Sequence, residues 1–125
     1  MIFYRTVLKS SDNSGARFVR CLKILKTISA YGKKKFGIVG DLILISNRYI
    51  IPTKKLKKGE LHKALIVRSR RPIKRMMGFL KFHENAILIL DKKMQPMGSR
   101  VFGPFAREVR VKKYEKLATI TRYIV

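Results

Sequence analysis

The stretch GSRVFGPFAREVR, residues 98–110, divides this chain into two parts. The sequence before it is typical of a compact β framework, and the sequence after it predicts a short helical tail. Its glycines permit close approaches and backbone conformations that a side chain forbids. Pro104 suits the first turn of a helix, where its missing N–H costs nothing, and Glu108 then lies near the positive N-terminal end of the helix dipole. We predict a strand-to-helix junction that displays three arginines and is suited to binding anions.

The net charge is the most informative property of the composition. The 125 residues include 30 Lys and Arg but 7 Asp and Glu, which gives a formal net charge of +23. Because such a surface repels itself, we expect a polyanionic partner. Nucleic acid is the leading candidate, and an anionic membrane surface is the alternative. Hydrophobic residues make up 46% of the chain, which excludes a chain that is disordered over its whole length.

Motifs of enzymatic chemistry are missing from the sequence. It contains no G-x-x-x-x-G-K-[ST] loop, no G-x-S-x-G turn and no H-E-x-x-H helix. His62 and His83 lack metal-ligand spacing to cysteine or carboxylate, and Cys21 has no cysteine partner for a disulfide. No apolar run reaches the roughly 18–20 residues that span a bilayer, and Met1–Arg5 lacks the apolar region of a secretory signal. We expect no enzyme, no metal and no cofactor.

Short apolar runs bounded by turn residues predict a mainly β fold. Residues 17–28 fit a helical face or a strand, and their β-branched residues and flanking turns favour a strand. Short strands at regular spacing, without long helices, indicate a closed or nearly closed barrel. The length predicts a single domain over residues 1–125, with the barrel over about 1–97 and the junction and helical tail over about 98–125. The expected strands are 6–8, 17–28, 42–45 (ended by Ser46 and Asn47), 64–67 and 86–90, with a turn at 10–15, an exposed loop at 31–36, a basic hairpin or long loop at 68–82 carrying Met76 and Met77 near its tip, and a helix at 111–118.

Basic residues gather in the segments before Gly59, along the predicted hairpin and around the 98–110 stretch. Arginine suits phosphate contacts because its planar fork donates hydrogen bonds in pairs, whereas lysine acts as a point charge. We interpret the hairpin as an arm laid into an RNA groove or junction. The residues that we expect to bind RNA are Arg17, Lys54, Lys55, Lys57, Lys58, Arg68, Arg70, Arg71, Lys74, Arg75, Arg107 and Arg110.

Aromatic residues interleaved with these charges allow two interpretations. They stack on bases, or they pack in the core, which is the better expectation for any one of them. These residues are Tyr31, Phe36, Tyr49, Phe79, Phe82 and Phe102.

Five motifs in register carry a family resemblance that runs from about Thr6 to Lys116. Together they closely resemble the L-fourteen family, a universal protein of the large ribosomal subunit. The motifs are SDNSGAR at 11–17, VGDLI at 39–43, KKGE at 57–60, ALIVR at 64–68 and GSRVFGP at 98–104.

The resemblance implies a five-stranded β-barrel with an extended hairpin and a small helical C-terminal part. It also implies a structural constituent of the large subunit that binds large-subunit rRNA at the subunit interface. Expected partners are the neighbouring L-nineteen protein, small-subunit rRNA through bridges, and a ribosome-silencing factor that blocks subunit joining. The family's docking residues for that factor correspond here to Ser99, Arg100 and Lys116.

The abundance of Lys, Ile, Phe and Tyr resembles organellar members coded by AT-rich genomes. With no transit peptide in the sequence, this predicts a mitochondrial ribosome in the matrix, and a plastid or bacterial origin is the alternative. A different hypothesis is a free-standing barrel that binds single-stranded nucleic acid through stacking aromatics such as Phe79 and Phe82. A membrane-surface protein is motivated by charge alone and lacks a broad amphipathic helix, so we expect no membrane partner.

Overall fold

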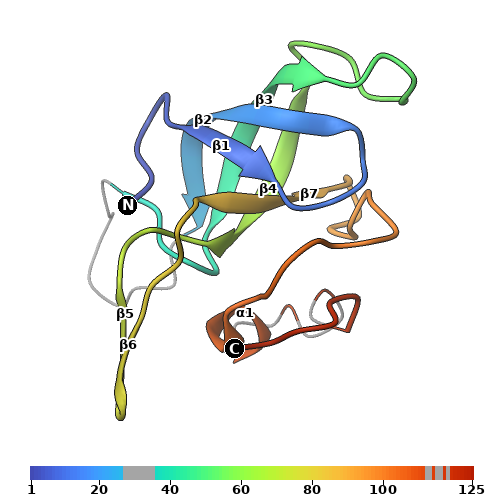
Figure 1. Ribbon diagram of the computed structural model, residues 1–125. Helices are drawn as coiled ribbons and strands as arrows, with labels where there is room; N and C mark the ends of the chain where they lie inside the picture. The colour runs from blue at the N-terminus through green and yellow to red at the C-terminus, as the bar shows by residue number, and fades with distance from the viewer. Residues whose placement is uncertain (27–35, 112–113, 115–116, 118) are drawn as a thin grey trace.

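A computed structural model describes residues 1–26, 36–111, 114, 117 and 119–125. Five strands form a closed barrel, in the order β1-β2-β3-β4-β7 (Figure 1). The mainly β fold and the barrel predicted from the sequence patterns are confirmed, as are the five strands that the family resemblance implies. The barrel strands are β1 (Val7–Ser10), β2 (Ala16–Lys26), β3 (Leu42–Ile50), β4 (Leu61–Arg68) and β7 (Ala86–Leu90).

The barrel closes where β1 meets β7. These strands run parallel, with Lys9 opposite Ala86 and Ser10 opposite Ile87, whereas all the other neighbours in the barrel are antiparallel. Ser11 extends the seam, because its backbone N–H and its hydroxyl both donate to the carbonyl of Ile87, at 2.9 and 2.8 Å. Closure removes the sheet edges that would otherwise expose unpaired backbone groups.

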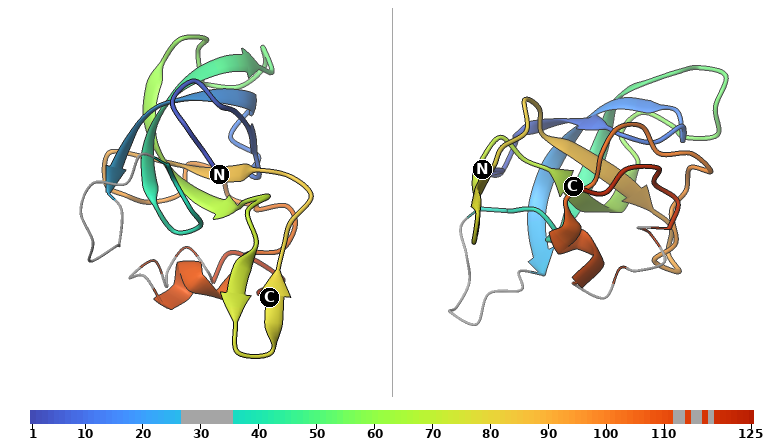
Figure 2. Two further views of the ribbon diagram at one scale, coloured as in Figure 1. Left: turned by 90° about the vertical axis from the view of Figure 1, so that its left-hand side faces the viewer. Right: turned by 60° about the horizontal axis from the view of Figure 1, so that its bottom comes forward.

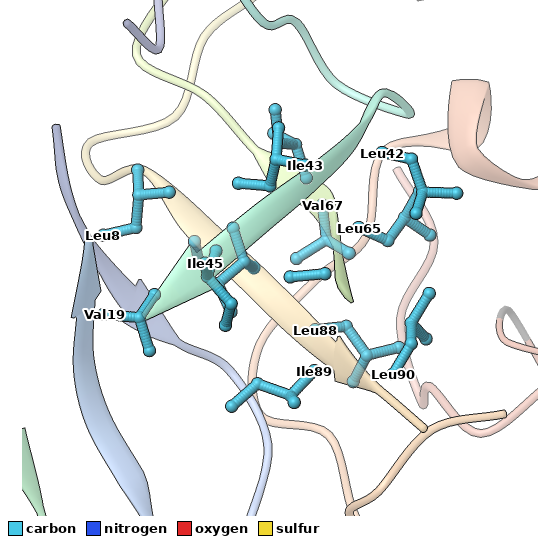
Figure 3. Packing of buried hydrophobic residues seen from close by; sticks show 14 of the residues in the cluster. Leu8, Val19, Leu42, Ile43, Ile45, Leu65, Val67, Leu88, Ile89 and Leu90 are labelled. Carbon is cyan, nitrogen blue, oxygen red and sulfur yellow. The ribbon is translucent and has the colours of Figure 1, made fainter. Parts of the chain in front are cut away.

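The barrel interior is filled by branched aliphatic side chains. Leu8, Val19, Ile43, Ile45 and Ile89 each retain no more than 1% exposure and belong to one cluster (Figure 3). All five residues of β7 are buried, so both faces of that strand are covered. The second cover comes from the C-terminal segment, whose buried residues Phe105, Ala106, Val109 and Leu117 belong to the same cluster.

Strand β3 is longer than predicted. Ser46 and Asn47 do not end it, because they pair with Arg20 and Val19 of β2 and the strand continues to Ile50. For residues 17–28, the choice of strand over helix is confirmed by β2 as far as Lys26. Residues 27–28 and 31–35, including most of the predicted exposed loop, lie outside the described residues.

The basic hairpin is confirmed and extends away from the barrel (Figures 1 and 2). Strands β5 (Ile73–Arg75) and β6 (Gly78–Leu80) pair in antiparallel register, with Arg75 opposite Gly78. Met76 and Met77 form the turn between them and are fully exposed.

The C-terminal helix α1 (Arg107–Val111) begins three residues after Pro104, which was predicted to lie in its first turn. The placement of Pro104 in its first turn is wrong, because Phe105 is held in an extended pairing with the chain end. Its N–H donates to the Tyr123 carbonyl at 2.9 Å, and its carbonyl accepts from Val125 N–H at 2.8 Å. Glu108 lies in the first turn, as expected. Of the predicted helix over 111–118, Val111 and Leu117 are helical and Tyr114 is not, and residues 112–113, 115–116 and 118 lie outside the described residues.

Candidate nucleic-acid interface

Several carboxylates accept hydrogen bonds from other groups of the protein. Asp12 is buried and accepts from the Ser10 and Ser14 hydroxyls and from Ile89 N–H. Asp41 is fully buried and accepts from Ile38 N–H at 2.9 Å. Because backbone and hydroxyl donors occupy these acids, they neutralise little of the surface charge. The exposed surface is left predominantly basic.

The loop between β3 and β4 displays four lysines on a fixed backbone. Leu56 is buried and anchors the loop, and the backbone carbonyl of Asn47 accepts from Gly59 N–H at 2.8 Å. The Glu60 carboxylate accepts from Lys57 N–H at 3.0 Å, and this hydrogen bond, with smaller effects of His62 and Lys57, lowers the pKa of Glu60. The lysine loop is therefore a charged projection of fixed shape. Its exposed lysines are Lys54, Lys55, Lys57 and Lys58.

The hairpin is tied to the C-terminal segment by Arg75. Its guanidinium donates to both Glu108 carboxylate oxygens, at 2.9 and 2.8 Å, and to the Val125 carbonyl at 2.9 Å. The paired hydrogen bonds with Glu108 raise the pKa of Arg75. Arg75 therefore orients the hairpin, while Lys74 beside it remains exposed.

Arg68 is buried at the end of β4 and fastens the C-terminal segment to the barrel. Its Nη1 donates to the carbonyls of Phe102 at 2.8 Å and Pro104 at 3.2 Å, and its Nη2 pairs with Glu84 at 3.1 Å. Gly103 lies so close to Arg68 that an added Cβ would overlap the guanidinium, and its φ of +80° also favours glycine. With a side-chain exposure of 6%, Arg68 offers RNA little surface, and we assign it a structural role. We call these contacts the Arg68 clasp.

Two arginines at the base of the hairpin are exposed and oriented. Arg70 Nε donates to the His83 carbonyl at 2.9 Å, and the Arg71 guanidinium lies 4.6 Å from the centre of the Phe36 ring. Such contacts restrict the side chains while their remaining N–H groups face solvent, which lowers the entropy lost on binding a phosphate. Arg17, Arg107 and Arg110 are also exposed, at the start of β2 and on α1.

Ser99 and Arg100 are exposed and bonded to the turn between β1 and β2. The Asn13 side chain donates to the Ser99 hydroxyl at 3.1 Å and accepts from Arg100 N–H at 3.1 Å. Both side chains therefore sit on one fixed surface. The third predicted docking residue, Lys116, lies outside the described residues.

The predicted RNA-binding residues do not form one site. The lysine loop and the hairpin lie at opposite ends of the molecule (Figures 1 and 2). A protein with cationic arms on opposite sides suits a position between several RNA segments. Sequence reasoning identified most of these cations but could not separate Arg68 and Arg75, which are held by acids, from the exposed ones.

The aromatic residues divide between core and surface. Phe82 is in the core as expected, but core packing is wrong for Tyr49, Phe79 and Phe102, which are all more than half exposed. Phe36 is half-buried against Phe3, and Tyr31 lies outside the described residues. Sequence reasoning missed Phe18, whose outward direction follows only from the register of β2.

No group of three or more His, Cys, Asp and Glu side chains suited to holding a metal ion occurs in the described part of the chain. Within the same residues, no helix is both long and apolar enough to span a bilayer.

Comparison with known protein families gives a match over the full length of the chain. The family model described as Ribosomal protein L14p/L23e matches residues 1–125.

We predict that Arg68→Met lowers the free energy of unfolding by about 1–3 kcal/mol. Methionine fills the space of the apolar part of the arginine side chain. It lacks the guanidinium that donates to the carbonyls of Phe102 and Pro104 and pairs with Glu84. Urea unfolding measures the loss. Lys63→Met, at an exposed position of the same strand, is the control and is expected to change stability by about 0.5 kcal/mol or less. Equal stability of Arg68→Met and the unsubstituted protein would contradict the clasp.

The pH dependence of the same variant gives a second readout. Partial burial raises the pKa of Glu84, but the Lys9 hydrogen bond and the Arg68 charge outweigh it, so the pKa falls below its ordinary 4.5. The stability linked to ionised Glu84 is therefore present above pH 4.5 and is lost as pH falls through the lower folded pKa. Arg68→Met is expected to lose less stability in that acid range than the unsubstituted protein, and identical slopes would exclude the Arg68–Glu84 contribution.

Proposed function

The chain belongs to the Ribosomal protein L14p/L23e family, and from this premise we propose how it holds rRNA. Membership makes it a protein of the large ribosomal subunit that binds rRNA, with a structural rather than an enzymatic role. We propose that the exposed cations at the start of β2, on the lysine loop, on the hairpin and on α1 contact rRNA phosphates at the subunit interface. The observation that carries this proposal is the placement of cations on opposite arms while the acids are bonded within the fold.

The proposed phosphate contacts exclude two of the basic residues singled out from the sequence. Arg68 and Arg75 hold the C-terminal segment and the hairpin through Glu84 and Glu108. The remaining cations are exposed, and RNA neutralises the self-repulsion of a chain with a net charge of +23. The residues proposed to contact rRNA are Arg17, Lys54, Lys55, Lys57, Lys58, Arg70, Arg71, Lys74, Arg107 and Arg110.

The partners beyond rRNA form a second part of the proposal. We infer contacts with the neighbouring L-nineteen protein and bridges to small-subunit rRNA, as the family resemblance implies. The hairpin supports them because it extends beyond the barrel with a positive edge and ends in the exposed apolar side chains of Met76 and Met77. Side chains of this kind adapt to varied partner surfaces.

The third part concerns regulation through subunit joining. Ser99 and Arg100 are adjacent, exposed and fixed by Asn13, which supports a preformed docking surface for a ribosome-silencing factor. Lys116 belongs to this surface by the resemblance alone. The family resemblance implies that a factor bound there blocks subunit joining.

We also propose that the ribosome is mitochondrial and works in the matrix, with a plastid or bacterial ribosome as the alternative. The support is the abundance of Lys, Ile, Phe and Tyr, which resembles members coded by AT-rich organellar genomes.

The phosphate contacts are tested by replacing Arg70 and Arg71 together with glutamine. We expect weaker binding to large-subunit rRNA and a log–log salt slope that is shallower by about 1.4–1.8, because each lost contact removes about 0.7–0.9. Filter binding across a salt series measures both quantities. The control replaces the exposed pair Lys92 and Lys93, which removes the same charge outside the proposed contacts. Equal effects of the two double variants would show that only net charge matters.

The docking surface is tested by Arg100→Glu. Reversing this charge is expected to weaken silencing-factor binding at least about tenfold, because an anion then replaces a cation of the proposed docking surface, while binding of the protein to rRNA changes less. Pull-down of the factor by large subunits carrying the variant measures the first effect, and rRNA binding measures the second. Arg122→Glu, at another exposed arginine, is the control. Equal losses in both assays would refute a separate docking role for Arg100.

A further inference from the structure

A pocket of about 540 Å³ lies beside the start of β2. Three distant parts of the chain line it: the β1–β2 turn, the β3–β4 loop and the junction before α1. Its walls include Asn13, Arg17, Phe18, Lys54 and Phe102. The volume falls in the range of about 300–1,000 Å³ that is common for small-molecule sites.

The walls of this pocket are held by buried hydrogen bonds. Asp12 Oδ1 accepts from the hydroxyls of Ser10 and Ser14, each at 2.6 Å, and its Oδ2 accepts from Ile89 N–H at 3.2 Å. The backbone N–H of Phe102 donates to the Ser11 carbonyl at 2.6 Å. The β1–β2 turn is therefore attached to both β7 and the junction, so that the pocket is formed before any ligand arrives.

Gly15 brings the third wall into place. Its φ is +111°, and an added Cβ would overlap the side chain of Lys54. The Gly15 carbonyl also accepts from Ile51 N–H at 2.8 Å. A glycine at this position lets the turn lie directly against the Lys54 stem, which places that lysine on the pocket that Arg17 also lines.

Two phenylalanines line the pocket and remain exposed to solvent. Phe18 is 45% exposed and Phe102 is 57% exposed, whereas Phe82 and Phe105 are buried in the core. Phe18 pairs across the strands with Lys9 of β1 and Tyr49 of β3, so aromatic and cationic side chains continue along the same outer surface. Exposed rings beside cations are the usual elements of a nucleobase stacking site.

The charges around the rings favour an anionic occupant. Among ion pairs in which both partners are described, the cations are Lys9, His62, Arg68 and Arg75. Arg17 and Lys54 take part in none of them. The one buried carboxylate on the pocket, Asp12, is occupied by its internal donors.

We propose that this pocket holds a single unstacked nucleotide of the bound RNA. Its base lies against the rings of Phe18 and Phe102, and its flanking phosphates contact Arg17 and Lys54. An apolar side chain of a neighbouring protein would match the rings but would leave both cations without anions. The proposal rests on the rRNA-binding function above and adds to it a specific feature of the RNA, a base free of its helix.

The test compares two probes with the full-length protein: a short RNA duplex with one bulged adenosine and the same duplex without the bulge. Fluorescence anisotropy is expected to show about tenfold tighter binding of the bulged duplex, since base–aromatic stacking contributes about 1–3 kcal/mol per base. Phe18→Leu and Phe102→Leu keep apolar side chains but lose the ring, and each is expected to reduce this preference several-fold. Affinity for the paired duplex should stay unchanged. Phe79→Leu, at the exposed hairpin ring, is the control and should keep the preference.

A cross-linking measurement keeps the test independent of variant folding. A 4-thiouridine in the bulge is expected to cross-link the unsubstituted protein within 9–18 or at Phe102. Salt-dependent binding of both duplexes with no preference for the bulge would overturn the pocket assignment and leave the rRNA-binding function intact. Cross-links elsewhere, with a preference that survives both leucine variants, would also overturn it and would favour a protein side chain as occupant. Binding of neither duplex would contradict the proposed RNA contacts and the pocket together.

Discussion

The fold depends on the Arg68 clasp, which joins its barrel and its C-terminal segment. The guanidinium of Arg68 donates to the carbonyls of Phe102 and Pro104 and pairs with Glu84, which Lys9 of β1 also contacts. The clasp fixes the chain between the barrel and α1, next to the segment whose Phe105 and Val109 are buried in the core. The exposed ring of Phe102 is fixed by the same backbone contacts. The buried Arg68 therefore fixes the backbone that carries Phe102, a residue of the surface proposed to bind RNA.

The distribution of charge explains how so basic a chain folds. Among the acids that the structure describes, Asp12, Asp41 and Glu60 accept from backbone N–H groups, and Glu84 and Glu108 tie distant segments together. The cations are left on exposed arms that point away from one another, which reduces their mutual repulsion until RNA supplies the opposite charge. Stability and RNA binding are thereby assigned to different residues, and mutations can separate them.

The sequence was informative where local patterns decide the structure. The buried runs of β4 and β7 and the Arg-rich hairpin were readable because burial on both faces and turn chemistry leave local signals. The length of β3 could not be predicted in this way, since Ser46 and Asn47 remain in the strand through pairing with β2. The burial of Arg68 and the pocket at Phe18 could not be predicted from the sequence either, because each is assembled from segments far apart in the chain. The ribosomal function was inferred from the family resemblance, because the residue patterns alone indicate only a nucleic-acid partner.

The central claim is that this chain is a stable component of the large ribosomal subunit. The most direct test is gradient sedimentation of a native lysate, made from whole cells and from isolated mitochondria, with magnesium present and then chelated. Immunoblotting follows the chain across the fractions. We predict that it migrates with the large subunit after chelation has separated the two subunits. A signal that stays at the top of the gradient in both conditions would contradict the claim and indicate a free nucleic-acid-binding protein.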